Sequence, residues 1–573
     1  MKNFLNTVSA AALGFGVLLS APLSAETLSG AYLAGRSAAA NNDLAATAAY
    51  SAAALARDSG NVALMENAIH AYLALGEFDR AKPLAEALLS EGQRSQGARM
   101  VATVRLIDDG EFDVLAQREV QTEGISPWVD GLVKAWALIG ADDIDAAMAQ
   151  FDTVSTDAGM RGVVAYHRML ALGTLGRYAE AQALFETGAL GTTARTRRGV
   201  IAYVEILSQL DRNADGVKAI AETFNGATDP ELDVVIERLE SGEKLPFATA
   251  PTVRAGLAEV FYTFASLLQA EQASNYYTLL YARVARHLRP DHVDALLLTA
   301  ELLESLGQNE LAIAEYRSLP ADDPSYHVAE LGRAAGLRLL GKVDQAVEVL
   351  EQLTRSDKEL AVAYSTLGDI LRSQNKEPEA IAAYSQALGS ITQEDPRAWF
   401  LHFSRGIAYS RNGQNVEAEE DFRAALAVNP DQPQVLNYLG YSLVEEQRKL
   451  DEALDMIERA VAASPDSGYI VDSLGWVYYR LGRYEEAVAQ MERAVELEAV
   501  DPVVNDHLGD VYWAVGRKRE AQFQWRRALS FIEFSTSDTE AEPDRIRRKL
   551  EIGLDAVLEE EGAAPLEQVA HDD

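Results

Sequence analysis

The chain has 573 residues, of which 48% are hydrophobic and 24% charged, a composition typical of an ordered protein with several domains or one extended repeat structure. Its formal net charge of −37 argues against nucleic acid or an anionic membrane surface as the main partner. Because the chain contains no cysteine, disulfides, thiolate nucleophiles, cysteine-based metal sites and a lipidated N-terminal cysteine are excluded.

Residues 1–25 have the features of a secretory signal peptide. Lys2 provides a positive charge, residues 8–19 form an apolar core, and Leu23-Ser24-Ala25 supply a small-residue cleavage site. The core is shorter than the roughly 20 residues needed to cross a bilayer. We therefore expect cleavage after Ala25. The small-residue signal and the abundance of alanine favour a soluble periplasmic protein of a Gram-negative bacterium; an uncleaved anchor and release from the cell are the alternatives.

Residues 26–224 carry a weak repeat. The tetrapeptide GEFD occurs at Gly76–Asp79 and again at Gly110–Asp113, 34 residues later, and LGRYAEAQALF at 175–185 is nearly a complete second helix of the unit described below. Corresponding positions, at intervals of 32 or 34 residues, are Thr47, Ala81, Leu115, Ala147 and Ala181. This region is predicted to form divergent helical repeats.

The repeat disappears after Phe224. Residues 225–255 contain proline and glycine in a stretch without clear periodicity, NGATDPELDVVIERLESGEKLPFATAPTVRA. Such residues punctuate regular structure. We predict an irregular linker here, acting as a hinge between two helical arms.

A regular period of about 34 residues governs residues 256–534. An alanine recurs at Ala312, Ala346, Ala380, Ala418, Ala453, Ala487 and Ala521. About twelve residues before each lies another small residue: Ala300, Ala334, Gly368, Gly406, Gly440, Gly475 and Gly509. Four residues after each alanine lies a large apolar residue: Tyr316, Leu350, Tyr384, Phe422, Ile457, Met491 and Trp525.

This spacing predicts two helices per unit joined by a short turn, with turn glycines at Gly307, Gly341, Gly413, Gly482 and Gly516. Small residues let the two helix backbones approach, and the large residue one turn later fills the space between them. One hairpin cannot bury its apolar face alone, so neighbouring hairpins must stack. The fold class predicted is an all-α helical solenoid.

Residues 535–573 follow the last repeat. The segment DRIRRKLEIGLDAVLEEE, Asp544 to Glu561, is amphipathic and predicts a capping helix that covers the last apolar face. The remaining residues, 562–573, predict an acidic tail.

The unit at Asp472–Leu497 closely resembles the tetratricopeptide repeat. The positions that carry this resemblance are Leu474-Gly475, Tyr478, Gly482, Tyr484, Ala487 and Ala494. The resemblance implies a right-handed superhelix of roughly a dozen units. The whole chain after residue 25, especially 437–460 and 504–529, also resembles large proteobacterial tetratricopeptide proteins that are similar to the outer-membrane lipoprotein adaptor of a periplasmic carboxyl-terminal processing protease.

In tetratricopeptide superhelices the first helix of each unit lines a concave groove, and the resemblance places thirteen residues of this chain there. They are Phe400, Phe403, Asn437, Tyr438, Tyr441, Tyr469, Asp472, Trp476, Tyr479, Arg480, Asp506, His507 and Trp513. Aromatic residues flanked by Arg and Asp are common at binding hot spots, so this set is predicted to grip an extended polypeptide. The alternative is that some of these aromatics pack between repeats. The Lys/Asn clamp that holds a carboxylate terminus in some relatives is not matched, because Asp472 and Asp506 would repel a carboxylate.

The sequence offers little for catalysis. It has no HExxH, GxxxxGK[ST] or GxSxG motif in a plausible context. The cluster HLRPDHVD at 287–294 has metal-ligating side chains but is typical of a turn between repeats. Basic clusters at 195–198, 283–289 and 545–549 allow either docking of an acidic partner or pairing with nearby carboxylates. We therefore expect no enzyme activity, cofactor or metal.

The sequence thus predicts an exported, non-catalytic scaffold of the cell envelope. By its resemblance, it would bind a periplasmic processing protease and its substrates. The alternative is a structural subunit of an envelope polysaccharide-export or division complex.

Overall fold

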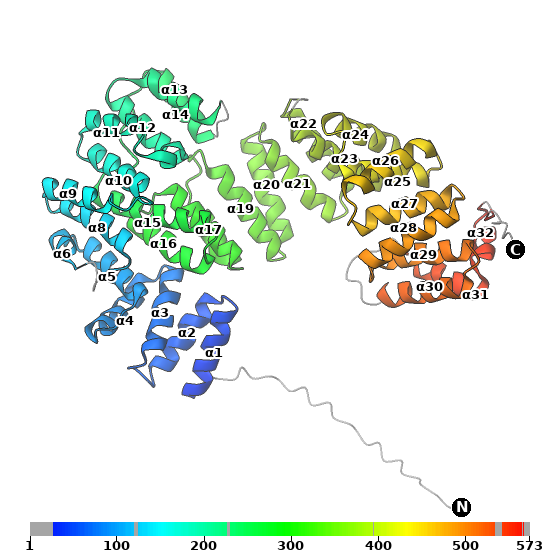
Figure 1. The fold of residues 1–573 in the computed structure, drawn as a ribbon, viewed down its shortest axis with the longest axis horizontal. Helices are drawn as coiled ribbons and strands as arrows, with labels where there is room; N and C mark the ends of the chain where they lie inside the picture. Colours follow the sequence, from blue (N-terminus) through cyan, green and yellow to red (C-terminus); the bar gives the residue numbers. More distant parts are fainter. Residues whose placement is uncertain are drawn as a thin grey trace, which may run out of the picture. The chain divides into compact units, whose positions relative to one another are not determined.

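The computed structural model describes residues 27–119, 124–225, 230–392, 395–532, 541–563 and 565–566. These residues form 31 α-helices and one short 3-10 helix and contain no strand, which confirms the predicted all-α fold (Figure 1). The predicted signal peptide, residues 1–25, and most of the predicted acidic tail lie outside the described residues. Among the helices described, none combines the length and apolar character that a membrane crossing requires.

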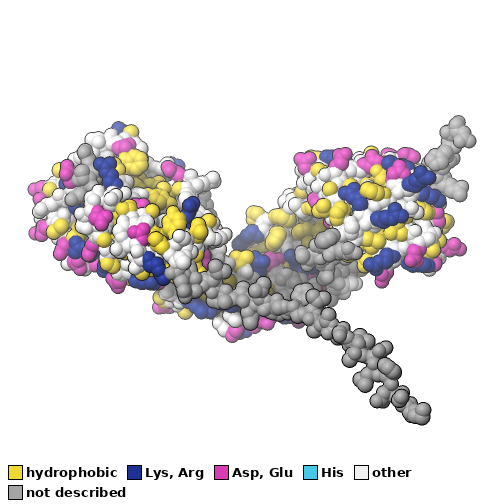
Figure 2. Space-filling model, turned by 90° about the horizontal axis from the view of Figure 1, so that it is seen from below, with side chains coloured by type: hydrophobic (Ala, Val, Ile, Leu, Met, Phe, Trp, Pro, Cys, Tyr) yellow, Lys and Arg dark blue, Asp and Glu magenta, His cyan; other side chains and the backbone are white. Residues whose placement is uncertain are grey.

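The chain divides into two compact units, residues 1–346 and 347–573, with the division inside α20 (Val343–Ser356). On the face shown in Figure 2, Asp and Glu side chains are spread over the surface of both units, with Lys and Arg side chains among them. The excess negative charge is therefore not gathered into a single patch on that face.

The N-terminal unit begins with a series of helical hairpins. Their first helices are α1 (Leu28–Ala40), α3 (Val62–Leu75), α5 (Gln96–Asp108), α8 (Pro127–Gly140), α10 (Arg161–Thr174) and α12 (Arg197–Gln209). Their second helices are α2 (Leu44–Leu55), α4 (Phe78–Ser90), α6 (Phe112–Gln117), α9 (Ile144–Val154), α11 (Tyr178–Glu186) and α13 (Asn213–Phe224). Thr47, Ala81, Leu115, Ala147 and Ala181 are all buried, as their place in the weak repeat requires.

The hairpin of α15 (Val253–Ala270) and α16 (Asn275–Leu288) packs against the first helices of this series (Figure 1). α15 contacts α8 and α10, and α16 contacts α3 and α5. Trp136 of α8 is fully buried against Gly256 of α15, and Arg283 of α16 donates to the carbonyl oxygen of Ala74, 2.8 Å away. The face that first helices would offer to a partner is therefore covered by the chain itself in this part of the unit.

The predicted linker differs from the structure. Residues 230–240 form α14 (Pro230–Glu240), which contacts α13, and residues 243–252 form neither helix nor strand and pack on α10 and α12. Phe247 lies against Gly173, and the backbone N–H groups of Ala248 and Thr249 donate to Glu205. Because these contacts tie the segment to its own unit, the boundary between compact units falls about a hundred residues later. The unit ends with α17 (Val293–Ser305), α18 (Asn309–Tyr316) and α19 (Tyr326–Leu339).

The C-terminal unit is a regular stack of hairpins. Its helices are α21 (Ala361–Ser373), α22 (Glu377–Gly389), α23 (Ala398–Arg411), α24 (Asn415–Val428), α25 (Pro433–Glu445), α26 (Leu450–Ala463), α27 (Gly468–Arg480), α28 (Tyr484–Leu497), α29 (Pro502–Ala514) and α30 (Lys518–Ile532). The predicted turn glycine Gly482 has φ +70°, and Asn375 takes the same left-handed conformation (φ +56°) where the glycine is missing.

The periodic glycine near the middle of each first helix in this unit faces the large residue that the period predicts. A Cβ atom added at Gly406 would lie 2.6 Å from the ring of Phe422, and one added at Gly475 would lie 2.8 Å from Met491. Phe422 and Met491 are almost completely buried. The periodic small and large residues are therefore the contact between the two helices of one hairpin.

The C-terminal segment forms two helices rather than the single capping helix predicted for 544–561. They are α31 (Pro543–Ile552) and α32 (Leu554–Glu560). Gly553 separates them because its φ of +85° lies outside the helical region, and it lies directly against the ring of Trp513. α31 contacts α30, so the segment covers the last hairpin as expected.

Candidate functional site

A groove of about 560 Å³ opens along the first helices of the C-terminal unit. It is lined by Asn437, Tyr438, Tyr441, Tyr469, Asp472, Ser473, Glu498, Asp501, Val503, Val504 and His507. Most of these residues come in pairs four apart on α25, α27 and α29, which places both members of a pair on one helix face. Six of the thirteen residues predicted for the groove thus lie together in it.

An ion pair connects two neighbouring helices at this groove. His507 Nδ1 lies 2.9 Å from Asp472 Oδ2. Burial opposes protonation of His507, but the carboxylates of Asp472, Asp506 and Asp510 outweigh it and raise the pKa of the imidazole above its usual value. The imidazole therefore holds its proton more readily than an exposed histidine does.

Two acceptor atoms in the groove wall have no hydrogen-bond partner. They are Oδ1 of Asn437 and the second carboxylate oxygen, Oδ1, of Asp472. The side chains are almost completely buried, with only 6% and 5% of their residues' surfaces exposed. An unsatisfied buried acceptor costs about 1–3 kcal/mol, so both atoms stand to gain from a donor that a ligand brings.

Two tyrosines and Glu498 are the exposed residues among those that line the groove. Tyr438 is 42% exposed and Tyr469 is 49% exposed, whereas most large apolar side chains of this unit are buried. Tyr438 also touches Phe403 edge-on, with ring centroids 5.3 Å apart. Phe403 is half-buried and packs on the core residue Phe422, so it supports the wall of the groove.

Trp476 and Tyr479 pack between repeats, as the alternative interpretation proposed. The Trp476 ring lies between His507 and Tyr479, with centroids 4.1 Å and 4.8 Å away and nearly parallel planes. Its Nε1 donates to Glu445 Oε1 at 2.7 Å. Trp476 and Tyr479 each expose less than a tenth of their surface, and Arg480, half-buried in the last turn of α27, does not line the groove.

Asp506 and Trp513 are covered by the C-terminal helices. Lys549 of α31 places its Nζ 2.9 Å from both carboxylate oxygens of Asp506. Trp513 Nε1 donates to Asp555 of α32 at 2.9 Å. The expectation that these two side chains face a partner is therefore corrected: their partners are provided by the chain's own capping segment.

Phe400 lies in a separate apolar cavity of about 360 Å³ between α21 and α23. The cavity is lined by Ala361, Val362, Ser365, Ile391, Pro396, Arg397, Trp399, Phe400 and Leu401. Phe400 and Val362 are each a little over 40% exposed. The prediction that Phe400 faces a partner is compatible with this exposure, but Phe400 does not belong to the tyrosine-lined groove.

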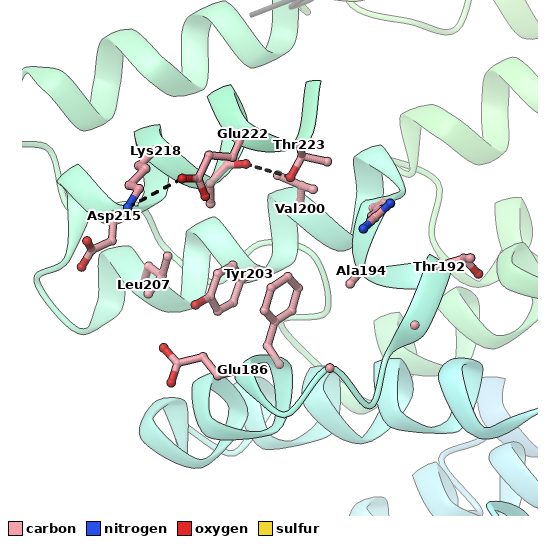
Figure 3. Close-up of a pocket in the computed structure, with 15 residues that line it drawn as sticks. Glu186, Thr192, Ala194, Val200, Tyr203, Leu207, Asp215, Lys218, Glu222 and Thr223 are labelled. Atoms are coloured by element: carbon pink, nitrogen blue, oxygen red, sulfur yellow. Dashed lines mark hydrogen bonds and ion pairs between the residues drawn. The ribbon is translucent and has the colours of Figure 1, made fainter. Parts of the chain in front are cut away.

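The N-terminal unit holds a larger pocket of about 830 Å³ that sequence reasoning missed (Figure 3). Phe185 stacks on Tyr203, with ring centroids 3.6 Å apart, and charged side chains of both signs surround them. Among these, Lys218 pairs with Glu222. The pocket opens where α11 ends after nine residues and a 3-10 helix, η1 (Gly191–Arg195), replaces further helix. In the sequence, the break is marked by Gly188 and Gly191, which follow the helix and both have positive φ in the structure.

Each of the three basic clusters contains a side chain that pairs with carboxylates of the chain itself. Arg198 pairs with Glu259, a side chain with no exposed surface, and lies 3.0 Å from Asp294. Arg283 pairs with Glu315, and Lys549 with Asp506 and Asp510. Pairing with nearby carboxylates, rather than docking, thus accounts for these three residues.

Among the residues that the structure describes, no group of three or more metal-ligating side chains lies together. In the cluster at 287–294, His292 caps α17 by accepting from the N–H of Ala295. In the groove, the Ser473 hydroxyl donates to the carbonyl oxygen of Tyr469, 3.0 Å away, and not to His507. The groove can bind and orient a ligand.

Two family models, both described as tetratricopeptide repeat, match the chain. One matches residues 267–327, 334–398, 403–468 and 445–502, and the other matches residues 162–187. These matches confirm the resemblance that the 34-residue period predicts. They do not bear on the closer resemblance to protease adaptors.

Similar proteins include the TPR repeat-containing protein PA4667 of Pseudomonas aeruginosa, 28% identical over 184 residues, which are 32% of this chain and 30% of that protein. The human protein O-mannosyl-transferase TMTC1 is 26% identical over 174 residues, 30% of this chain and 20% of that protein. The chain thus spans less than a third of either relative. Among solved structures, the APC/C hetero-tetramer Cut9-Hcn1 aligns with 92% of this chain and 96% of that chain at 14% identity and a TM-score of 0.38.

Proposed function

Because the chain contains tetratricopeptide repeats, which suggest a protein–protein interaction scaffold and are generally non-catalytic, we propose that it is an exported adaptor of the cell envelope. The observation that carries the proposal is the groove on α25, α27 and α29. There the chain leaves tyrosines exposed and acceptor atoms unsatisfied on the helix face that it covers elsewhere.

Export rests on the leader at residues 1–25. Fractionation of cells that carry a C-terminally tagged chain, followed by mass spectrometry of the purified protein, tests it. A periplasmic protein that begins at Glu26 is the expected result. A chain that keeps Met1 and sediments with membranes would instead indicate an uncleaved anchor.

The partner that we propose is a periplasmic carboxyl-terminal processing protease, to which the chain would deliver substrates. The support is the resemblance of residues 437–460 and 504–529 to adaptors of such proteases. This chain lacks the cysteine that anchors the similar lipoprotein. The adaptor proposed here would therefore work without a lipid anchor.

Affinity capture from envelope extracts tests the adaptor role. The chain is compared with Tyr469→Ala, which removes an exposed groove ring, and with Phe523→Ala, which removes a 58% exposed ring on α30 outside the groove. We expect the protease to be captured by the chain and by Phe523→Ala but not by Tyr469→Ala. Groove-dependent recovery of polysaccharide-export or division components would favour the structural alternative. Turnover of a peptide or glycan by the pure protein would overturn the non-catalytic proposal.

A further inference from the structure

The charge of the groove is negative. Asp472, Glu498 and Asp501 line it, His507 is the one titratable base among the lining residues, and neither Lys nor Arg is among them. Asp472 pairs with His507 through one oxygen only. The pair is close to neutral when the imidazole is protonated, and Glu498 and Asp501 then give the lining its net negative charge.

The hydrogen-bonding capacity of the groove is also one-sided. Asn437 Oδ1 and Asp472 Oδ1 are acceptors without donors, on two neighbouring first helices. A backbone N–H, an ammonium or a guanidinium could satisfy them, whereas a carboxylate could not. The groove therefore selects for a ligand that donates hydrogen bonds.

The exposed tyrosine rings of the groove also favour a positively charged ligand. Tyr438 and Tyr469 are exposed at the groove, and the faces of tyrosine rings attract cations. The Arg side chains of this unit already use tyrosines in this way: Arg483 lies 4.5 Å from the Tyr478 ring centroid and Arg517 lies 3.9 Å from that of Tyr512. Tyr438 and Tyr469 have no such cation from the chain among the contacts described.

We propose that the groove on α25, α27 and α29 binds an extended polypeptide segment that carries a Lys or Arg side chain. The cation lies among the tyrosine rings and the carboxylates, and donors of the segment bond to Asn437 and Asp472. This inference rests on the proposed function, since it names the chemistry of the partner that the adaptor would bind.

A displayed library of random peptides tests the inference without a known partner. Peptides of about 12 residues are long enough, when extended, to cross three stacked helices. The immobilised full-length chain selects peptides, and those that also bind Tyr469→Ala are discarded. The selected peptides are then labelled with a fluorophore, and their affinities are measured by anisotropy alongside copies in which each Lys or Arg is replaced by Gln.

A matched pair of charge variants locates the binding. Glu498→Gln removes a carboxylate from the groove, and Glu485→Gln removes an exposed carboxylate from the neighbouring helix α28 outside it. We expect selected peptides to be enriched in Lys and Arg and to lose about tenfold in affinity on Gln replacement or in Glu498→Gln. Glu485→Gln is expected to bind as the unaltered chain does, and added salt is expected to weaken binding.

The outcomes separate this inference from the proposed function. Groove-dependent peptides that are acidic or uncharged would overturn the inference and leave the adaptor role standing. Failure to select any peptide that distinguishes the chain from Tyr469→Ala would overturn both.

Discussion

Lys549 in α31 places its Nζ atom 2.6 Å from Oδ1 of Asp510 in α29, and the lysine side chain has no exposed surface. The same ammonium lies 2.9 Å from both carboxylate oxygens of Asp506. One buried ammonium thus bonds to two buried carboxylates of the last regular hairpin, and Arg545 of the same helix lies 3.7 Å from Asp510. The capping segment therefore does more than cover an apolar face, because it compensates charges that the repeat carries.

Replacing Lys549 by Met should destabilise the end of the solenoid by about 3–5 kcal/mol, because two buried carboxylates would lose the ammonium that bonds to both of them. Burial raises the pKa of Asp506, so protonation relieves part of this cost and the loss should be smaller at pH 5 than at pH 8. Urea unfolding combined with hydrogen exchange of α29 to α32 measures the loss. The control is Arg547→Met, whose pair with Asp544 is exposed and contributes about 1 kcal/mol or less. Similar losses for the two variants would contradict the prediction.

Replacing Gly406 by Ala should cost about 1–3 kcal/mol, because the new Cβ atom would lie 2.6 Å from the buried ring of Phe422. Gly389→Ala is the matched control: it also lies in a helix, but nothing is within 4 Å of the added atom. That change should be neutral or stabilise by up to about 1 kcal/mol. Thermal unfolding of both variants measures their stability relative to the unaltered chain. If Phe422→Leu does not recover part of the loss in the Gly406→Ala background, the steric explanation fails.

The periodic part of this fold could be predicted from the sequence because it depends on contacts within one hairpin. Gly475 and Met491 are only 16 residues apart, and this spacing recurs in each regular unit except that of Gly440 and Ile457, which are 17 residues apart. The groove residues Asn437, Asp472 and His507 are predicted through the resemblance to tetratricopeptide repeats, which places first helices along a groove, and all three line the groove of the structure. Contacts within one hairpin can therefore be predicted, because they recur at a nearly fixed spacing in the sequence.

Contacts between parts of the chain that are far apart in the sequence produce no such periodic pattern in it. Gln96 donates to Tyr281, and Trp136 packs against Gly256, across more than a hundred residues in each case. No spacing rule predicts that α15 and α16 would cover the first helices of the N-terminal unit. The assignment of Asp506 to the open groove failed for the same reason, because the ammonium that pairs with it comes from Lys549 in a helix without the repeat.

Glu205 makes the stability of the N-terminal unit depend on pH. Its Oε2 accepts from the N–H groups of Ala248 and Thr249, at 3.1 and 2.9 Å, and burial raises its pKa from 4.5 to about 7. Because the folded pKa is the higher one, the folded state binds the proton more tightly. The protonated Glu205 carboxyl therefore contributes to the free energy of unfolding below about pH 4.5, and this contribution is lost as the pH rises through about 7. The full effect is about 3 kcal/mol.

Glu205→Gln keeps an acceptor for the two N–H groups and cannot ionise. We expect it to unfold at higher urea concentration than the unaltered chain at pH 8, with the advantage shrinking towards pH 4.5. The exposed Glu240→Gln on α14 is the control and should follow the unaltered chain at each pH. Curves for Glu205→Gln that run parallel to those of the unaltered chain would show that this carboxyl does not titrate as the structure requires.

His507 should titrate above the usual histidine pKa of about 6.5, because the carboxylates of Asp472, Asp506 and Asp510 outweigh the effect of its burial. Its folded pKa is raised, so the stabilisation that it provides is present below about pH 6.5 and disappears as the pH rises through the folded value. NMR titration, with the resonance assigned through His507→Gln, measures this pKa. Asp472→Asn should lower this pKa, and an unchanged pKa in that variant would contradict the ion pair seen here.

Loss of the imidazolium proton also makes the groove more negative. A peptide that carries Lys or Arg should therefore bind the unaltered chain more tightly once the pH exceeds the pKa of His507. In His507→Gln, the affinity for the same peptide should not change across this pH range.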